Sequence, residues 1–204
     1  YLRAGGRYGI DYLMLTHLHS DHTTGVVRLL NLMNVNTVIM PDNAEDTNGD
    51  DVLDDIIAAC EENGTKIVYI TRDTEFTAGA IRLSVYESSE RGSRDESGIM
   101  STVSIGDYDM LVTGDVEKVV ERELVSLHDL TDTELLIVPH HGSKYSTSDE
   151  LLSELRPETA VISTGYNRYG HPTKETLDKL NEYGVNVLRT DELGRIVLHV
   201  ASGD

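Results

Sequence analysis

Short apolar segments that end in histidine or aspartate recur along this chain, and this arrangement constrains its fold more than any other feature. The apolar run at residues 12–16 leads directly into "HLHSDH", which places three histidines and an aspartate within six residues, namely His17, His19, Asp21 and His22. Apolar runs of this kind alternate with amphipathic stretches of helical period, which is typical of strands and helices packed in layers. The pattern therefore predicts an α/β or α+β fold.

The predicted strands are short apolar or β-branched runs, at residues 12–16, 37–40, 66–70, 81–86, 100–105, 109–113, 135–138, 159–163, 185–189 and 195–200. One helix is predicted to begin near His22, and another spans 52–60 because apolar side chains recur there with helical period. Two later helices are predicted to open at Thr147 and at Pro172, and a further one covers 116–127. With 204 residues, the chain is long enough for one sizeable core.

The first histidine group has the composition and spacing of a metal site. In an extended segment, His17 and His19 are two residues apart and point the same way, so they can hold one ion. Asp21 and His22 follow a turn of the chain and can reach a second ion nearby. Neutral imidazole and carboxylate are ligands of zinc and similar divalent ions. The alternative is a polar helix start that is capped by Asp21.

Three further strand ends deliver histidine or aspartate toward one edge. "LVTGD" ends in Asp115, whose carboxylate can bridge two cations or, more simply, cap the next helix. "LIVPHHGSKYSTS" supplies His140 and His141, of which we expect one to be a ligand and the other a proton-transfer or ligand-orienting group. "STGYNRYGHP" places His171 at a helix start, where it can cap or favour an anion. We expect His128, His199 and Cys60 to be structural.

The charge of the chain bears on its partners. A formal charge of −19, from 36 acidic and 17 basic residues, argues against tight binding of nucleic acid through a broad basic face. A local basic or metal-lined cleft can still hold a phosphate. No stretch approaches the roughly 20 apolar residues of a membrane span, so we expect no membrane contact from this chain itself.

These motifs resemble the metallo-β-lactamase superfamily. The stretch from His17 to His22 matches its HxHxDH signature, and Asp115 matches its bridging aspartate. "PHHGSKYSTS", "AVISTGYNRYGHP" and "LRTDELGRIVL" together resemble the C-terminal hydrolase domain of the ComEC family of competence proteins and related stand-alone hydrolases, over about residues 10–198. The resemblance implies an α+β fold, an αββα four-layer sandwich.

The sequence departs from the superfamily pattern at two points. The opening strands with their "DGG" turn are absent, so we expect residues 1–204 to be a single hydrolase domain that is incomplete at its N-terminus. The usual third histidine is also missing, because residues 23–114 contain none, a lack shared by ComEC-like members. His140 or a water would then complete that metal shell, or the metal would bind only with substrate.

The resemblance also implies a set of roles. Two divalent ions, zinc first and manganese second, would lower the pKa of a bridging water. Asp21 would orient that water, and His141 or His171 would protonate the leaving oxygen. Ser143, Lys144 and Arg168 would hold the phosphate. The implied metal ligands are His17, His19, Asp21, His22, Asp115 and His140.

The expected function is that of a metal-dependent hydrolase acting as a phosphodiesterase or nuclease. Its partner would be a phosphodiester, with single-stranded DNA as the candidate that the ComEC resemblance implies. One alternative is an esterase of small, phosphocholine-type phosphodiesters in the cell envelope, and another is a non-catalytic metal-binding domain of a DNA-uptake membrane protein. As part of a ComEC-type protein the chain would be extracytoplasmic or membrane-associated, and otherwise cytoplasmic.

Overall fold

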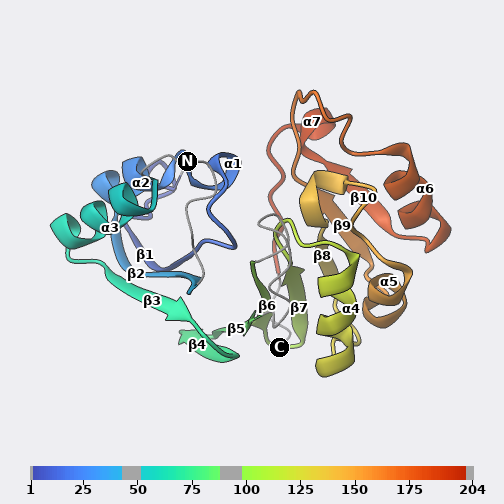
Figure 1. The fold of residues 1–204 in the computed structure, drawn as a ribbon, viewed down its shortest axis with the longest axis horizontal. Coiled ribbons are helices and arrows are strands. Elements are labelled where there is room, and N and C mark those ends of the chain that lie inside the picture. Colours follow the sequence, from blue (N-terminus) through green and yellow to red (C-terminus); the bar gives the residue numbers. More distant parts are fainter. Residues whose placement is uncertain (1, 43–51, 88–97, 201–204) are drawn as a thin grey trace. The chain divides into compact units, whose positions relative to one another are not determined.

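The computed structural model describes residues 2–42, 52–87 and 98–200, which form two compact units, Tyr1–Asp73 and Thr74–Asp204. Figure 1 labels the helices and strands of both. Each unit has its own sheet and its own buried core. Whether 1–204 is one functional domain stays a prediction. None of the helices in these described stretches has the length and apolar character that crossing a bilayer requires.

The first unit is a parallel three-stranded sheet in the order β1-β2-β3. Its strands are β1 (Gly9–Met14), β2 (Asn34–Pro41) and β3 (Lys66–Ile70). Parallel neighbours need a crossover connection. The crossovers contain α2 (Val26–Leu32) and α3 (Val52–Asn63), whose apolar faces share a core with β2. Cys60 is buried in this core, as predicted.

The expected helix near His22 forms in two pieces. A single turn, α1 (Ser20–Thr23), contains Asp21 and His22 of the histidine motif, and α2 starts after Gly25. The break allows the chain to leave the end of β1 and then turn back along the sheet. The motif therefore lies on a short turn between β1 and the first crossover helix.

The second unit contains a seven-stranded sheet in the order β10-β9-β8-β7-β6-β5-β4. The antiparallel part consists of β4 (Thr74–Ala78), β5 (Ile81–Glu87), β6 (Ile99–Ile105) and β7 (Tyr108–Val112). The parallel part continues from β7 through β8 (Leu135–Ile137), β9 (Thr159–Ile162) and β10 (Asn186–Arg189). The carboxyl ends of β7, β8 and β9 therefore meet at one edge of this sheet.

Helices pack on the parallel part of this sheet. They are α4 (Lys118–Leu127), α5 (Asp149–Leu155) and α6 (Lys174–Glu182), with a short 3-10 turn η1 (Pro139–Gly142) after β8 and a last turn α7 (Thr190–Leu193) after β10. Their shared core includes Leu111 and Leu136 of the strands with Leu124, Leu151 and Leu180 of the helices. This packing fixes the loops that follow β7, β8 and β9.

Several element boundaries differ from the prediction. The N-cap of α5 is Ser148, whose hydroxyl accepts the backbone N–H of Leu151, and not Thr147. The N-cap of α6 is Thr173, so Pro172 precedes the helix instead of opening it. Thr147 cannot cap α5 because its backbone adopts a left-handed conformation (φ 59°), which turns the chain before the helix begins.

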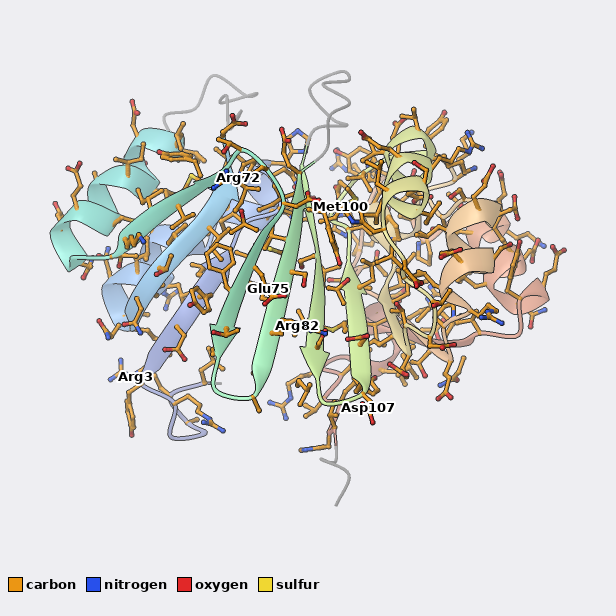
Figure 2. All side chains as sticks on the ribbon, turned by 90° about the horizontal axis from the view of Figure 1, so that it is seen from below. Arg3, Arg72, Glu75, Arg82, Met100 and Asp107 are labelled. Atoms are coloured by element: carbon orange, nitrogen blue, oxygen red, sulfur yellow. The ribbon has the colours of Figure 1, made fainter. Side chains whose placement is uncertain are left out.

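One strand was missed, and one predicted strand does not form. The strand β4 was missed because "TEFTA" alternates polar and apolar side chains and carries little apolar signal. It pairs with β5, and Figure 2 shows Glu75 and Arg82 on these two strands, with 4.0 Å between Arg82 Nε and Glu75 Oε2. Conversely, residues 195–200 were expected to be a strand and form none in the structure.

Candidate metal-binding site

The first cluster, His17, His19, Asp21 and His22, belongs to the first unit. The backbone N–H of Leu15 donates to the Ile39 carbonyl oxygen at 2.9 Å, so sheet pairing extends to two residues before His17. The buried ring of His17 lies 4.7 Å from that of His19 and 4.0 Å from that of His22, measured between ring centroids. The structure therefore brings the three imidazoles together.

Asp21 lies beside these rings and does not cap the helix. Its Oδ2 is 3.8 Å from Nε2 of His22. His19 occupies the N-cap position of α1, and no side chain caps that helix. The capping alternative for Asp21 is therefore wrong.

The second cluster, Asp115, His140, His141 and His171, lies in the second unit beyond the ends of β7, β8 and β9. Nε2 of His140 is 4.0 Å and Nε2 of His141 is 3.7 Å from the same Oδ2 atom of the buried Asp115. The N-cap of α4 is Glu117, so Asp115 is not its cap. Two imidazoles from adjacent residues thus converge on one carboxylate oxygen.

An unusual backbone turn explains this convergence. His140, His141 and Gly142 all have left-handed φ values, of 49°, 55° and 85°. For a residue with a Cβ this conformation costs about 1–2 kcal/mol. The turn is held at its start by a hydrogen bond from the His140 N–H to the Gly114 carbonyl oxygen at 3.0 Å. Strained backbone that is held in this way is often found at functional sites.

The hydrogen bonds of the two adjacent histidines differ. Nδ1 of His141 lies 2.7 Å from the Ser163 carbonyl oxygen, which can accept only if that nitrogen carries the proton. In the neutral ring, Nε2, the atom that faces Asp115, then has the lone pair, as in a metal-ligating histidine. Nδ1 of His140 is buried and makes no hydrogen bond within the described part of the chain. This donor set of imidazoles and a carboxylate fits a divalent cation.

His171 joins the cluster from the loop after β9. Its ring centroid is 5.6 Å from that of His140 and 5.9 Å from that of Tyr169, with which it stacks. Burial, followed by the neighbouring His140 and His141, lowers the pKa of His171. His171 does not cap α6, because Thr173 does.

The three predicted phosphate contacts have different environments. Lys144 and Arg168 are exposed on the loops that follow β8 and β9. Ser143 is buried, and its hydroxyl accepts the backbone N–H of Tyr145 at 3.3 Å. Its role toward a phosphate stays a prediction, as do the individual roles of the other residues in both clusters.

The sequence reasoning missed two groups near the second cluster. Tyr166 and Tyr169, on either side of Arg168, are 100% and 84% exposed. The alternation of aromatic and cationic residues in "YNRY" was a signal for them. Glu121 of α4 is fully buried, and nothing in the sequence distinguishes it from a solvated helix glutamate. Of the histidines expected to be structural, His128 packs its ring 4.3 Å from that of Tyr86.

Comparison with known proteins agrees with this geometry. The model of the family described as "Metallo-beta-lactamase superfamily" matches residues 1–87. The ComE operon protein 3 of Bacillus subtilis (strain 168) is 32% identical over 199 residues, covering 96% of this chain and 25% of that protein. The chain belongs to the metallo-β-lactamase superfamily, as a ComEC-like domain.

Other relatives of this ComEC-like domain carry related names. Competence protein ComA of Neisseria gonorrhoeae is 34% identical over 119 residues, which cover 56% of this chain and 17% of the relative. Recombination protein 2 of Haemophilus influenzae is 37% identical over 95 residues, or 46% of this chain and 12% of the relative. The matched segments thus span a quarter or less of the length of these curated relatives.

Solved structures confirm the α+β metallo-β-lactamase fold of this chain. The metallo-β-lactamase fold protein YhfI from Bacillus subtilis has a TM-score of 0.58 at 13% identity, over 89% of this chain and 74% of YhfI. Igni18, a metallo hydrolase from Ignicoccus hospitalis, has the same TM-score and identity, and the match covers 89% of this chain and 76% of Igni18. CmlA, a diiron β-hydroxylase from Streptomyces venezuelae, has a TM-score of 0.61 at 14% identity, over 90% of this chain and 44% of CmlA.

Proposed function

We propose that this chain is a metal-dependent phosphodiesterase that acts on single-stranded nucleic acid. The chain has a metallo-β-lactamase fold with candidate metal-binding residues, and the proposal adds the metal, the reaction and the substrate. The observation that carries it is the second cluster, in which Asp115 faces His140 and His141 while a backbone carbonyl orients the ring of His141.

Each cluster would supply ligands to divalent ions, with zinc as our first candidate and manganese as the second. His17, His19, Asp21 and His22 are the donors of the first cluster, and Asp115, His140 and His141 those of the second. A bound divalent ion supplies a water of lowered pKa and polarises a phosphoryl oxygen. The hydrogen bond to Ser163 would keep the His141 ring in one orientation and one tautomer.

The protein groups around the second cluster have complementary tasks. Lys144 and Arg168 would contact phosphate oxygens, because both carry exposed positive charge on loops beyond the same sheet edge. His171, adjacent to His140, would contact the leaving oxygen. Asp21 would bind one ion and orient the water, as the family resemblance implies.

The exposed tyrosines favour a nucleic acid over a small phosphodiester. Tyr166 and Tyr169 present their rings to solvent on either side of Arg168. Aromatic rings next to cationic side chains form stacking platforms for successive bases of a single strand. Since the net charge is −19, such local contacts would have to replace a broad basic face.

A non-catalytic role in a larger protein is the second candidate. It is favoured by the absence of any histidine from residues 23–114, and by relatives that are several times the length of this chain. In this case the chain would bind metal as one domain of a DNA-uptake protein without hydrolysing a phosphodiester.

The decisive experiment measures hydrolysis and metal content together. The purified chain is loaded with Zn²⁺ or Mn²⁺ and assayed on single-stranded DNA and on bis(p-nitrophenyl) phosphate, with chelator-treated protein and Asp115→Asn as controls. Metal-dependent cleavage of both substrates supports the proposal. Cleavage of bis(p-nitrophenyl) phosphate alone indicates a small-phosphodiester esterase. Bound metal without any turnover indicates the non-catalytic role.

A further inference from the structure

The side chain of Glu121 is a buried carboxylate that the proposed reaction does not use. It lies on α4 and is 0% exposed. Its Oε1 accepts the backbone N–H of Thr147 and its Oε2 that of Ser148, each at 2.6 Å. Burying a carboxylate is costly unless hydrogen bonds compensate, and such charge-assisted bonds are short and strong. The position therefore has a specific requirement for two acceptor oxygens.

The two backbone groups that Glu121 binds lie at the end of the loop that carries the adjacent histidines. The loop starts with the left-handed turn at His140–Gly142 and ends at Ser148, the N-cap of α5. Thr147, just before that cap, is itself left-handed and buried. Without the carboxylate, two buried N–H groups in a strained backbone would lose their acceptors.

Other contacts join the same loop to the segment that carries Asp115. The hydroxyl of Ser146 donates to the Val116 carbonyl oxygen at 2.8 Å, and the backbone N–H of Lys118 donates to the Tyr145 carbonyl oxygen at 3.1 Å. At the other end, the His140 N–H donates to the Gly114 carbonyl oxygen. Hydrogen bonds therefore join the segment from Gly114 to Glu121 to both ends of the loop. The two bonds that Glu121 accepts are the last of these along the loop.

We propose that Glu121 is a positioning residue, which fixes the loop from His140 to Ser148 and thereby holds His140 and His141 against Asp115. It would touch neither metal nor substrate. The inference rests on one part of the proposed function, namely that Asp115, His140 and His141 bind a metal. A carboxylate suits the task better than an amide, because glutamine has a single acceptor oxygen and its NH₂ group would face one of the two N–H donors.

The test compares Glu121→Gln with Val120→Ala, a neighbouring α4 core residue that is also 0% exposed. Zn²⁺ affinity is measured by competition with a chromophoric chelator, loop order by amide hydrogen exchange of residues 140–148, and stability by Tm. For Glu121→Gln we expect about a 10-fold weaker metal affinity, the size seen when a group behind a metal ligand is removed, together with faster exchange of the Thr147 and Ser148 amides. Val120→Ala should lower Tm while metal affinity stays within about twofold of wild type.

A second variant covers the event that Glu121→Gln does not fold. Glu121→Asp retains two acceptor oxygens on a shorter side chain and should give intermediate affinity and exchange. Equal metal affinity in wild type and Glu121→Gln overturns the inference, as does a loss of affinity that follows Tm alike in the Val120 and Glu121 variants. Tight metal binding without hydrolysis by the wild type overturns the proposed function alone. A wild type that binds no metal overturns both.

Discussion

Nε2 of His141 lies 3.7 Å from Oδ2 of Asp115, although the two residues follow different strands of the second sheet. The strands are β7 and β8, which are adjacent and parallel, so the residues beyond their ends emerge at the same edge. The left-handed turn after Pro139 then directs two consecutive imidazoles toward one carboxylate. This relationship makes the order of roles in the histidine pair testable.

We expect His141→Ala to lower metal content more than His140→Ala. The sequence-based assignment made His140 the ligand and His141 the acid, but the bond from His141 to the Ser163 carbonyl oxygen is the contact typical of a ligand. Elemental analysis and phosphodiesterase rates on both variants decide the question. If His140→Ala loses the metal, while His141→Ala keeps it and slows turnover by roughly 10²–10⁴, then His140 is the ligand and His141 the acid.

The first cluster should bind metal through Asp21 and His22. Replacing both with alanine removes a carboxylate and one of three clustered imidazoles, the ring that lies 4.0 Å from His17. We expect the double variant to lose at least one equivalent of bound metal without a change in secondary structure. Inductively coupled plasma mass spectrometry gives the stoichiometry, and Ser20→Ala within the same motif is the control. An unchanged metal-to-protein ratio would contradict the two-metal interpretation.

Gly142→Ala should destabilise the chain strongly. The residue has φ of 85°, and an added Cβ would lie 2.6 Å from Cβ of Pro172, so a side chain meets both backbone strain and a steric clash. We expect the free energy of unfolding to fall by about 2–4 kcal/mol. Gly106→Ala separates the two effects, because Gly106 has φ of 61° with nothing within 4 Å. Urea denaturation of both variants measures the difference, and equal losses would exclude the clash with Pro172.

The sequence pattern was sufficient to predict a mixed fold, α/β or α+β, and the residues that cluster within each unit. Apolar runs that end in His or Asp located β1, β7, β8 and β9, because strands alternate visibly with amphipathic helices. The resemblance to metallo-β-lactamases added the fold family. Prediction failed where tertiary contacts decide the local structure. The polar strand β4 exists through its pairing with β5, and residues 195–200 have strand composition without forming a strand.

The backbone at the second cluster was beyond sequence-based prediction for the same reason. Consecutive histidines were expected to take separate roles because neighbouring side chains usually diverge. The left-handed turn at His140 and His141 is accompanied by the bond to Gly114 and by the close approach of Gly142 to Pro172, and both are tertiary contacts. Similarly, the burial of Glu121 follows from the approach of the loop to α4, which the helical pattern does not contain.

The stability of the chain should depend on pH through Glu121. Burial raises the pKa of its carboxyl, and this effect outweighs the lowering by hydrogen bonds from Ser148 and Thr147. The folded state therefore binds the proton more tightly than the unfolded state. This contribution to stability is fully present below the unfolded-state pKa and is lost as pH rises through the higher folded-state pKa.

The comparison with Glu121→Gln isolates this contribution. Urea denaturation between about pH 4 and pH 8 gives the free energy of unfolding of each protein. The advantage of wild type over Glu121→Gln should shrink as pH rises across this window, because only the wild type has a proton to lose at this position. A constant difference between the two curves would show that burial does not perturb this carboxyl.

Tyr166 and Tyr169 should matter more for single-stranded DNA than for a small phosphodiester. Their rings are 100% and 84% exposed beside Arg168, a position that lets bases stack while the guanidinium contacts phosphate. We expect alanine at either position to weaken DNA binding by about 5- to 100-fold, since a stacked base is worth about 1–3 kcal/mol. The loss of activity on bis(p-nitrophenyl) phosphate should be much smaller, because that substrate has only one ring on each side of its phosphate and no run of bases to stack.

The control for a general effect of removing a surface ring is Tyr8→Ala, at a 66% exposed tyrosine of the first unit. Fluorescence anisotropy with a labelled oligonucleotide gives the affinities, and equal losses on both substrates would remove the stacking platform from the proposed function.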